Sequence, residues 1–218
     1  MKSWQSLGAI ASKKCLPFTK GRNGTALGEG AATLILERRS SVAARGGKVL
    51  GTVLGGACTS DGQHFTKPSR EGIARTIQEA MENAKVDVNT PLMISTHGTG
   101  TILNDECEAK ALLDIFKGNL SNKLAIASKG AHGHLLGATG AMEFLLGLLS
   151  IRSGWIPPAQ GSKSESFPFC LPLVLKDSKV ATNTVLLSNT FAFGGSNVVL
   201  LGNVECSEKR KYSIPKPN

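Results

Sequence analysis

The stretch PLMISTHGTGT, residues 91–101, decides the interpretation of the fold. It begins with a short apolar run, Leu92–Thr96, of the kind found in a strand that is covered on both faces. The residues that follow are polar and include Gly98 and Gly100, and glycine permits tight turns and a close approach of the backbone to a ligand. A buried strand that runs into such a loop is typical of a binding site at the carboxyl end of a sheet.

Strands and helices alternate on both sides of this stretch. On the upstream side, apolar residues Ile73, Ile77 and Met81 recur at helical spacing, and on the downstream side Asp105 with Glu108 resembles a helix cap. We predict strands at residues 27–37, 49–58, 92–96, 123–128, 171–175, 185–189 and 197–203, helices at 71–86, 105–118 and 134–151, and a basic loop at 38–48. The order predicts an α/β fold with a largely parallel sheet and an antiparallel edge.

Four polar loops follow predicted strands or lie at their ends, at residues 59–66, 97–101, 129–134 and 191–197. In open α/β sheets, ligands bind outside the carboxyl ends of the strands. We therefore expect these four loops to converge on one site.

Composition excludes several classes of protein. The chain has 218 residues, of which 41% are apolar and 19% charged, which is typical of a soluble globular protein and not of a disordered or fibrous one. No apolar run reaches the roughly 18 to 20 residues that a membrane span needs. Five cysteines without paired spacing indicate reduced thiols and a cytoplasmic location. The net charge of +9 comes largely from both ends, and it fits either an acidic partner or solvated termini.

Nucleotide and metal motifs are incomplete. Neither Gly28 with Gly30 nor Gly98 with Gly100 is followed by the third glycine of a dinucleotide-binding loop, and no phosphate-binding GxxxxGK[ST] loop occurs. A metal site could begin with His132 and His134, but no further ligands stand at a recognisable spacing. We expect no metal, no bound cofactor, no nucleic acid and no membrane among the partners.

Four segments carry a resemblance to a known family. The segments STHGTGT (95–101) and KGAHGHLLGATGA (129–141) resemble the His-Gly-Thr and Lys-x-x-x-Gly-His signatures of the β-ketoacyl carrier-protein synthases, condensing enzymes with a thiolase-like fold. The segment NTFAFGGSN (189–197) is similar to the family's glycine-rich Phe loop. PFTKGRNG (17–24), which leads into GEGA (28–31), resembles its mid-chain segment.

The resemblance covers nearly the whole chain and implies a division into three parts. Residues 1–48 would be the end of the synthase first half, residues 49–204 the thiolase-like C-terminal half, and residues 205–218 a basic tail. The implied fold is a mixed, mostly parallel sheet with helices on both faces.

The implied reaction is a decarboxylative Claisen condensation. An acyl group on an enzyme cysteine is attacked by the enolate that remains when malonyl carrier protein loses carbon dioxide. The resemblance makes His97, His134 and Lys129 catalytic: the two imidazoles would donate hydrogen bonds at decarboxylation, and Lys129 would set the local electrostatics. Glu108 stands where the family carries the acid that pairs with this lysine.

The resemblance also implies the substrate-binding residues and the partner. Thr99 and Thr101 would bind the phosphopantetheine arm of acyl carrier protein, and Phe193, followed by Gly194, would be the gate of the site, with a backbone N–H in the oxyanion hole. The arm delivers the substrates, so no separate cofactor is implied.

The sequence departs from the family pattern in its nucleophile. In the family the reactive cysteine lies in a first half that precedes every segment seen here. We interpret Cys58 as a structural thiol because the residues after it resemble a strand-end loop of the second half. Smaller departures are Ala192, where the family usually has glycine, and His132, an extra imidazole for which the sequence offers no explanation.

Three interpretations remain open at this point. The chain is the second half of an elongating synthase whose cysteine half comes from elsewhere, a non-catalytic partner like the chain-length factors that pair with a complete ketosynthase, or a fragment that would expose apolar surface and aggregate. Both functional interpretations require a ketosynthase subunit or the missing N-terminal half as a partner.

Overall fold

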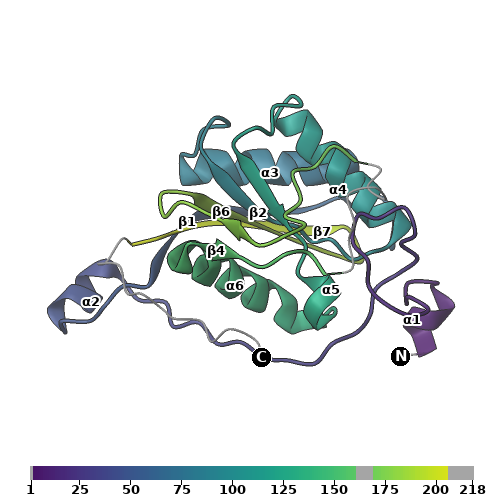
Figure 1. Ribbon diagram of the computed structural model, residues 1–218, viewed down its shortest axis with the longest axis horizontal. Coiled ribbons are helices and arrows are strands. Elements are labelled where there is room, and N and C mark those ends of the chain that lie inside the picture. Colours follow the sequence, from purple (N-terminus) through teal and green to yellow (C-terminus); the bar gives the residue numbers. More distant parts are fainter. Residues whose placement is uncertain (1, 161–168, 206–218) are drawn as a thin grey trace.

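A mixed five-stranded sheet with helices on both faces forms the centre of the molecule (Figure 1). The computed structural model describes residues 2–160 and 169–205. The strands are β1 (Gly51–Ser60), β7 (Ser196–Val204), β6 (Val185–Ala192), β2 (Leu92–Ser95) and β3 (Lys123–Ile126), in that spatial order. Because these five ranges match five predicted strands and helices cover both faces, the α/β class expected from the sequence is confirmed.

The sheet is parallel at one side and antiparallel at the other. Strand β2 runs parallel to both β3 and β6, and Leu92 lies opposite Lys123 and Val185. Strand β7 is antiparallel to β6 and to β1. The antiparallel part therefore involves two strand pairs and is wider than the single edge predicted.

The helices divide between the two faces of the sheet (Figure 1). On one face lie α3 (Arg70–Ala84), whose first turn is capped by the Ser69 hydroxyl accepting from the Gly72 N–H, and α4 (Ile102–Ile115). On the other face lies α6 (Thr139–Ser153). This arrangement follows the crossover connections that parallel strands require.

Strand β2 supplies both cores, because successive side chains of a strand point to opposite faces. Ile94 belongs to the core under α3 and α4, together with Ile77 and Leu112. Met93 belongs to the second core, which contains Phe144 from α6. All four residues of β2 are buried, as the continuous apolar run predicts.

Two predicted strands are wrong. Residues 27–37 are extended but form only an isolated bridge between Leu27 and His134, and residues 171–175 form only one between Leu173 and Ala125. A strand needs a neighbour for its backbone groups, and an apolar run cannot specify one. In the second segment Pro172 also has no N–H to donate to a ladder.

Other boundaries also differ from prediction. The helix expected at 134–151 begins later, because a 3₁₀ turn (Leu136–Ala138) precedes α6. The loop predicted at 129–134 contains a short helix, α5 (Lys129–His132). The basic loop at 38–48 contains a short helix, α2 (Arg39–Ala44). The remaining elements are α1 (Lys2–Ser6), β4 (Trp155–Ile156) and β5 (Ser178–Lys179).

The predicted cap of α4 is also wrong. The helix begins at Ile102, three residues before Asp105, and Thr101 at its N-cap makes no side-chain cap bond. The buried carboxylate of Asp105 instead accepts the N–H groups of Phe18 and Gly100, which ties the chain before and after β2 together. Asp105 therefore makes contacts with distant backbone groups and does not cap the helix.

The described ranges contain no helix that combines the length and the apolar character needed to cross a membrane. Of the predicted basic tail, residues 206–218 lie outside the described residues.

Candidate active site

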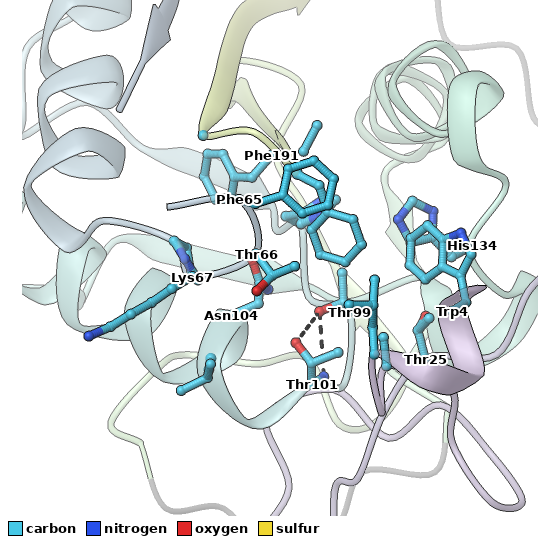
Figure 2. Close-up of a pocket in the computed structure, with 18 of the residues that line it drawn as sticks. Trp4, Thr25, Phe65, Thr66, Lys67, Thr99, Thr101, Asn104, His134 and Phe191 are labelled. Carbon is cyan, nitrogen blue, oxygen red and sulfur yellow. Dashed lines mark hydrogen bonds between the residues drawn. The ribbon is translucent and has the colours of Figure 1, made fainter. Parts of the chain in front are cut away.

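The predicted loops converge on one cavity of about 700 Å³ (Figure 2). His97 follows β2, His134 follows α5, and Phe191 is near the end of β6, while Phe65 comes from the loop after β1. Trp4 of α1 completes the wall beside His134. The expectation that the loops meet at one end of the sheet is confirmed.

His97 and His134 lie next to each other at this cavity. Their ring centroids are 5.6 Å apart with the planes nearly perpendicular, and the residues are only 4% and 9% exposed. Burial, with the nearby Lys129 charge as the next cause, lowers the pKa of His97 well below its usual value and that of His134 to about 4. Both imidazoles are therefore neutral at pH 7.

The surroundings of His134 fix which ring nitrogen carries the proton. The backbone N–H of Leu136 donates to Nδ1 at 3.1 Å, and the Thr139 hydroxyl lies 3.0 Å from the same atom. Because Nδ1 accepts, the proton of the neutral ring is on Nε2, which is left as a hydrogen-bond donor. Leu136 itself adopts a φ of 53°, in the left-handed region.

Lys129 is buried and makes its ion pair with Glu143. Its Nζ lies 2.7 and 2.9 Å from the two carboxylate oxygens of Glu143 on α6, and it also donates to the backbone carbonyl of His97. Ser128 donates its hydroxyl to the same carboxylate at 2.9 Å. The prediction that Glu108 is the partner of Lys129 is therefore wrong.

The two carboxylate oxygens of Glu108 accept hydrogen bonds from other groups. The carboxylate accepts the backbone N–H of His97 at 2.8 Å, that of Gly98 at 2.9 Å and the Asn189 amide at 2.9 Å. Burial raises the pKa of Glu108 to about 7 in spite of these three donors. The sequence identified an acid that supports the site, but Glu108 holds the backbone of the His97 loop and does not touch Lys129.

Three of the four predicted substrate-binding residues line the cavity, and the fourth, Gly194, does not. The hydroxyls of Thr99 and Thr101 lie 2.9 Å apart, and both residues line the cavity (Figure 2). Phe193 lines it as well, with its ring against Trp4. Gly194 is not among the lining residues, and its N–H donates to the carbonyl of Phe65 at 2.7 Å.

Three features of the site were missed by sequence reasoning. Glu143 is visible in the sequence only as a charge that interrupts an apolar helix. Trp4 lies far from every motif, and nothing in the sequence links it to the cavity that it lines. Lys67 is the only lysine or arginine among the described residues that line the cavity, and its side chain extends outward from the rim (Figure 2).

No cysteine of the described residues lines the cavity. Cys15 is buried behind the His97 loop, where its thiol donates to the carbonyl of Thr99 at 3.2 Å, and burial raises its pKa. Cys58 lies within β1, opposite Val198. Nor do the described residues contain a group of three or more His, Cys, Asp or Glu that could hold a metal ion.

The arrangement is suited to stabilising a developing oxyanion. Two neutral, buried imidazoles lie side by side at the cavity wall, and the contacts of His134 leave its Nε2 as an N–H donor. Such donors, held in place before the reaction, stabilise negative charge without adding a charge that must itself be desolvated.

The chain matches a family model and several curated proteins. Residues 50–163 match the family model described as "Beta-ketoacyl synthase, C-terminal domain". The chain is 33% identical over 204 residues to nodulation protein E of Rhizobium meliloti, covering 92% of this chain and 50% of that protein. It is 35% identical over 190 residues to 3-oxoacyl-[acyl-carrier-protein] synthase 2 of Staphylococcus aureus, covering 86% of this chain and 47% of that one.

A solved structure agrees with these relatives. The ishigamide ketosynthase/chain length factor superposes with a TM-score of 0.87 at 35% identity, over 94% of this chain and 50% of that chain. The chain thus spans about half the length of the curated relatives it matches. The match to the family model covers half of the sequence and includes both His97 and His134. The chain belongs to the β-ketoacyl synthase family, and its matched part is that family's C-terminal domain.

Proposed function

We propose that this chain supplies the histidine and lysine part of a site for decarboxylative Claisen condensation of malonyl carrier protein with an acyl thioester. The observation that carries the proposal is the buried pair of neutral imidazoles, His97 and His134, at one cavity. Lys129 lies behind them with its charge balanced by Glu143, so that it can orient the His97 loop without leaving an unpaired charge.

The proposed reaction forms an enolate, and hydrogen-bond donors such as the two imidazoles stabilise its negative charge. When the malonyl group loses carbon dioxide, the electron pair of the broken C–C bond becomes an enolate whose negative charge lies on the thioester oxygen. Hydrogen bonds from His97 and His134 stabilise this oxygen. The enolate carbon then attacks the carbonyl of an acyl group on a cysteine, the new C–C bond forms, and the cysteine thiolate leaves.

The cysteine would come from the part of the synthase that this chain does not span. The matched relatives are about twice as long as the matched region. Ile35 and Leu36 are 84% and 75% exposed in residues 27–37, the apolar segment that was predicted to be a strand. Exposed apolar residues in such a run favour a further protein layer at this surface, whether covalently joined or supplied by a partner subunit.

Acyl carrier protein is the partner that the proposed reaction requires. The name of the staphylococcal relative includes this protein, and the basic balance of the chain suits a partner that is typically acidic. Thr99 and Thr101 would bind the phosphopantetheine arm along the cavity wall.

A non-catalytic role is the second candidate. Its support is the absence of a cysteine among the described residues that line the cavity, together with the similarity to a structure named as a ketosynthase/chain length factor. Against it stand the buried ion pair and the fixed tautomer of His134, which a purely structural subunit does not need.

The test is the variant His134→Ala in the complex purified from the native host, with composition checked by native mass spectrometry. Loss of one oxyanion donor should lower malonyl decarboxylation about 10²- to 10³-fold while assembly is preserved. A matched control is His64→Asn, because the amide oxygen can replace His64 Nδ1 as acceptor for the N–H groups of Thr66 and Lys67 outside the reacting centre. Unchanged decarboxylation in the assembled His134→Ala complex would support the non-catalytic role.

A further inference from the structure

We propose that the cavity selects planar, conjugated acyl chains over saturated chains of equal length, an inference that rests on the proposed condensing function. Its basis is a continuous series of rings around the cavity, in which Trp4 is the central member. The inference depends on the whole ring series, in which Trp4 and three phenylalanines join the two histidines of the reacting centre.

The rings follow one another at contact distance. Trp4 lies 5.9 Å from His134 and 5.0 Å from Phe193, measured between ring centroids. Phe193 is in turn 5.9 Å from Phe65 at the rim. On the inner side, His134 is 5.6 Å from His97, and His97 is 5.5 Å from Phe191. All six residues line the cavity. Figure 2 labels four of them, Trp4, Phe65, His134 and Phe191.

Such a wall distinguishes flat chains from flexible ones. Aromatic faces and edges interact favourably with other π systems at separations of about 4.5 to 7 Å, beyond the gain from burying area alone. A conjugated chain presents a planar π face and has fewer rotatable bonds to immobilise than its saturated equivalent. The saturated chain gains only the burial of its methylene groups.

Trp4 is the most informative position in this series. It comes from α1, whereas the histidines come from the loops after β2 and α5, so its replacement does not remove a catalytic group. Its ring is tilted by 32° against Phe193 and stands nearly edge-on to His134, at 77°. Trp4 therefore joins the outer phenylalanine rings to the reacting centre.

The experiment compares two six-carbon acyl groups, hexa-2,4-dienoyl and hexanoyl, as pantetheine thioesters in condensation by the native complex. The wild type should prefer the dienoyl group about fivefold in kcat/KM, within the range of an aromatic pair. Trp4→Leu should bring this ratio close to one, and Trp4→Phe should retain most of the preference. Trp155→Leu is the matched control, because Trp155 lies on β4 and does not line the cavity.

A second measurement separates this inference from the proposed function. Dissociation constants of the corresponding non-reactive pantetheine amides, measured by calorimetry, report acyl selection without chemistry. If neither thioester is condensed but the amides show the preference, the proposed function fails and acyl selection stands. Equal binding of the two amides to the wild type, or a preference that survives Trp4→Leu, overturns the inference. Phe65→Leu at the rim repeats the test if Trp4→Leu does not fold.

Discussion

Lys129 and Glu143 form an ion pair with both side chains completely buried and 2.7 Å between Nζ and Oε1. The same ammonium donates to the carbonyl of His97, so one side chain joins α5, α6 and the loop after β2. The position of the His97 loop therefore depends on a buried ion pair that His97 contacts through its backbone carbonyl.

Breaking this pair from one side should destabilise the protein strongly. Glu143→Gln leaves the Lys129 ammonium buried without a counter-charge, and one-sided removal of a buried partner typically costs about 3 to 5 kcal/mol. We expect the free energy of unfolding in urea to fall by that order. Glu106→Gln is the control, since Glu106 pairs with Lys110 at the exposed surface, where an ion pair contributes little to stability. A loss in Glu143→Gln no larger than in the control would contradict a buried, charged pair.

The histidines should stay neutral at mildly acidic pH. The pKa of His134 is lowered to about 4 and that of His97 is well below its ordinary value, so the imidazole signals of both in ¹⁵N NMR should not change between pH 7 and pH 5.5. Midpoints near pH 6.5 would show that the rings are hydrated and freely protonated.

Acid should accordingly weaken the fold through His134. Its folded-state pKa lies below the unfolded value of about 6.5, so protonation favours the unfolded chain, and stability falls as pH decreases from about 6.5 towards 4. The full effect is about 3 kcal/mol at most. Asp105 and Glu108 act in the opposite direction, because burial raises their pKa values to about 6 and about 7. Replacing His134 by Gln should reduce the fall of the urea unfolding midpoint between pH 6.5 and pH 4. If the midpoint falls as in the wild type, other groups cause the loss of stability in acid.

Removing the carboxylate of Glu108 should disorder the His97 loop. Glu108→Ala leaves the N–H groups of His97 and Gly98 without their acceptor, and each unsatisfied buried donor costs about 1 to 3 kcal/mol. Hydrogen exchange of these two amides should therefore become much faster than in the wild type. Protection that is unchanged in the variant would mean that another group accepts from them.

Lys67 should contribute to binding the charged end of the phosphopantetheine arm. It extends outward from the rim, and no carboxylate of the described residues pairs with it. We expect Lys67→Ala to weaken binding of 4′-phosphopantetheine several-fold, more at low salt than at high salt, and to leave binding of pantetheine unchanged. Lys176→Ala, at an exposed position that does not line the cavity, is the matched control. Equal weakening for both ligands would exclude a phosphate contact.

Local pattern was sufficient to predict the strands and loops that carry the histidines. Leu92–Ser95 is a buried strand because its apolar run is continuous, and the glycines after His97 show where it ends. The predictions that failed are those that depend on a neighbour. Residues 27–37 are apolar enough for a strand, but the described chain offers them one bridge only.

The partner of Lys129 shows the same limit at the site. Glu108 on α4 and Glu143 on α6 are both acids on helices that cover the sheet, and only the spatial arrangement shows that Glu108 accepts from the backbone of the His97 loop. Trp4 gives no signal at all in the sequence, because its place in the cavity depends on the path of α1 relative to residues more than a hundred positions away.

Leu136 carries backbone strain next to the site. A leucine in the left-handed region is strained by about 1 to 2 kcal/mol, and glycine would remove that strain. The contact that decides which nitrogen of His134 is the donor is made by the backbone N–H, which glycine also has. A glycine at this turn should therefore raise thermal stability and leave the protonated nitrogen of His134 unchanged.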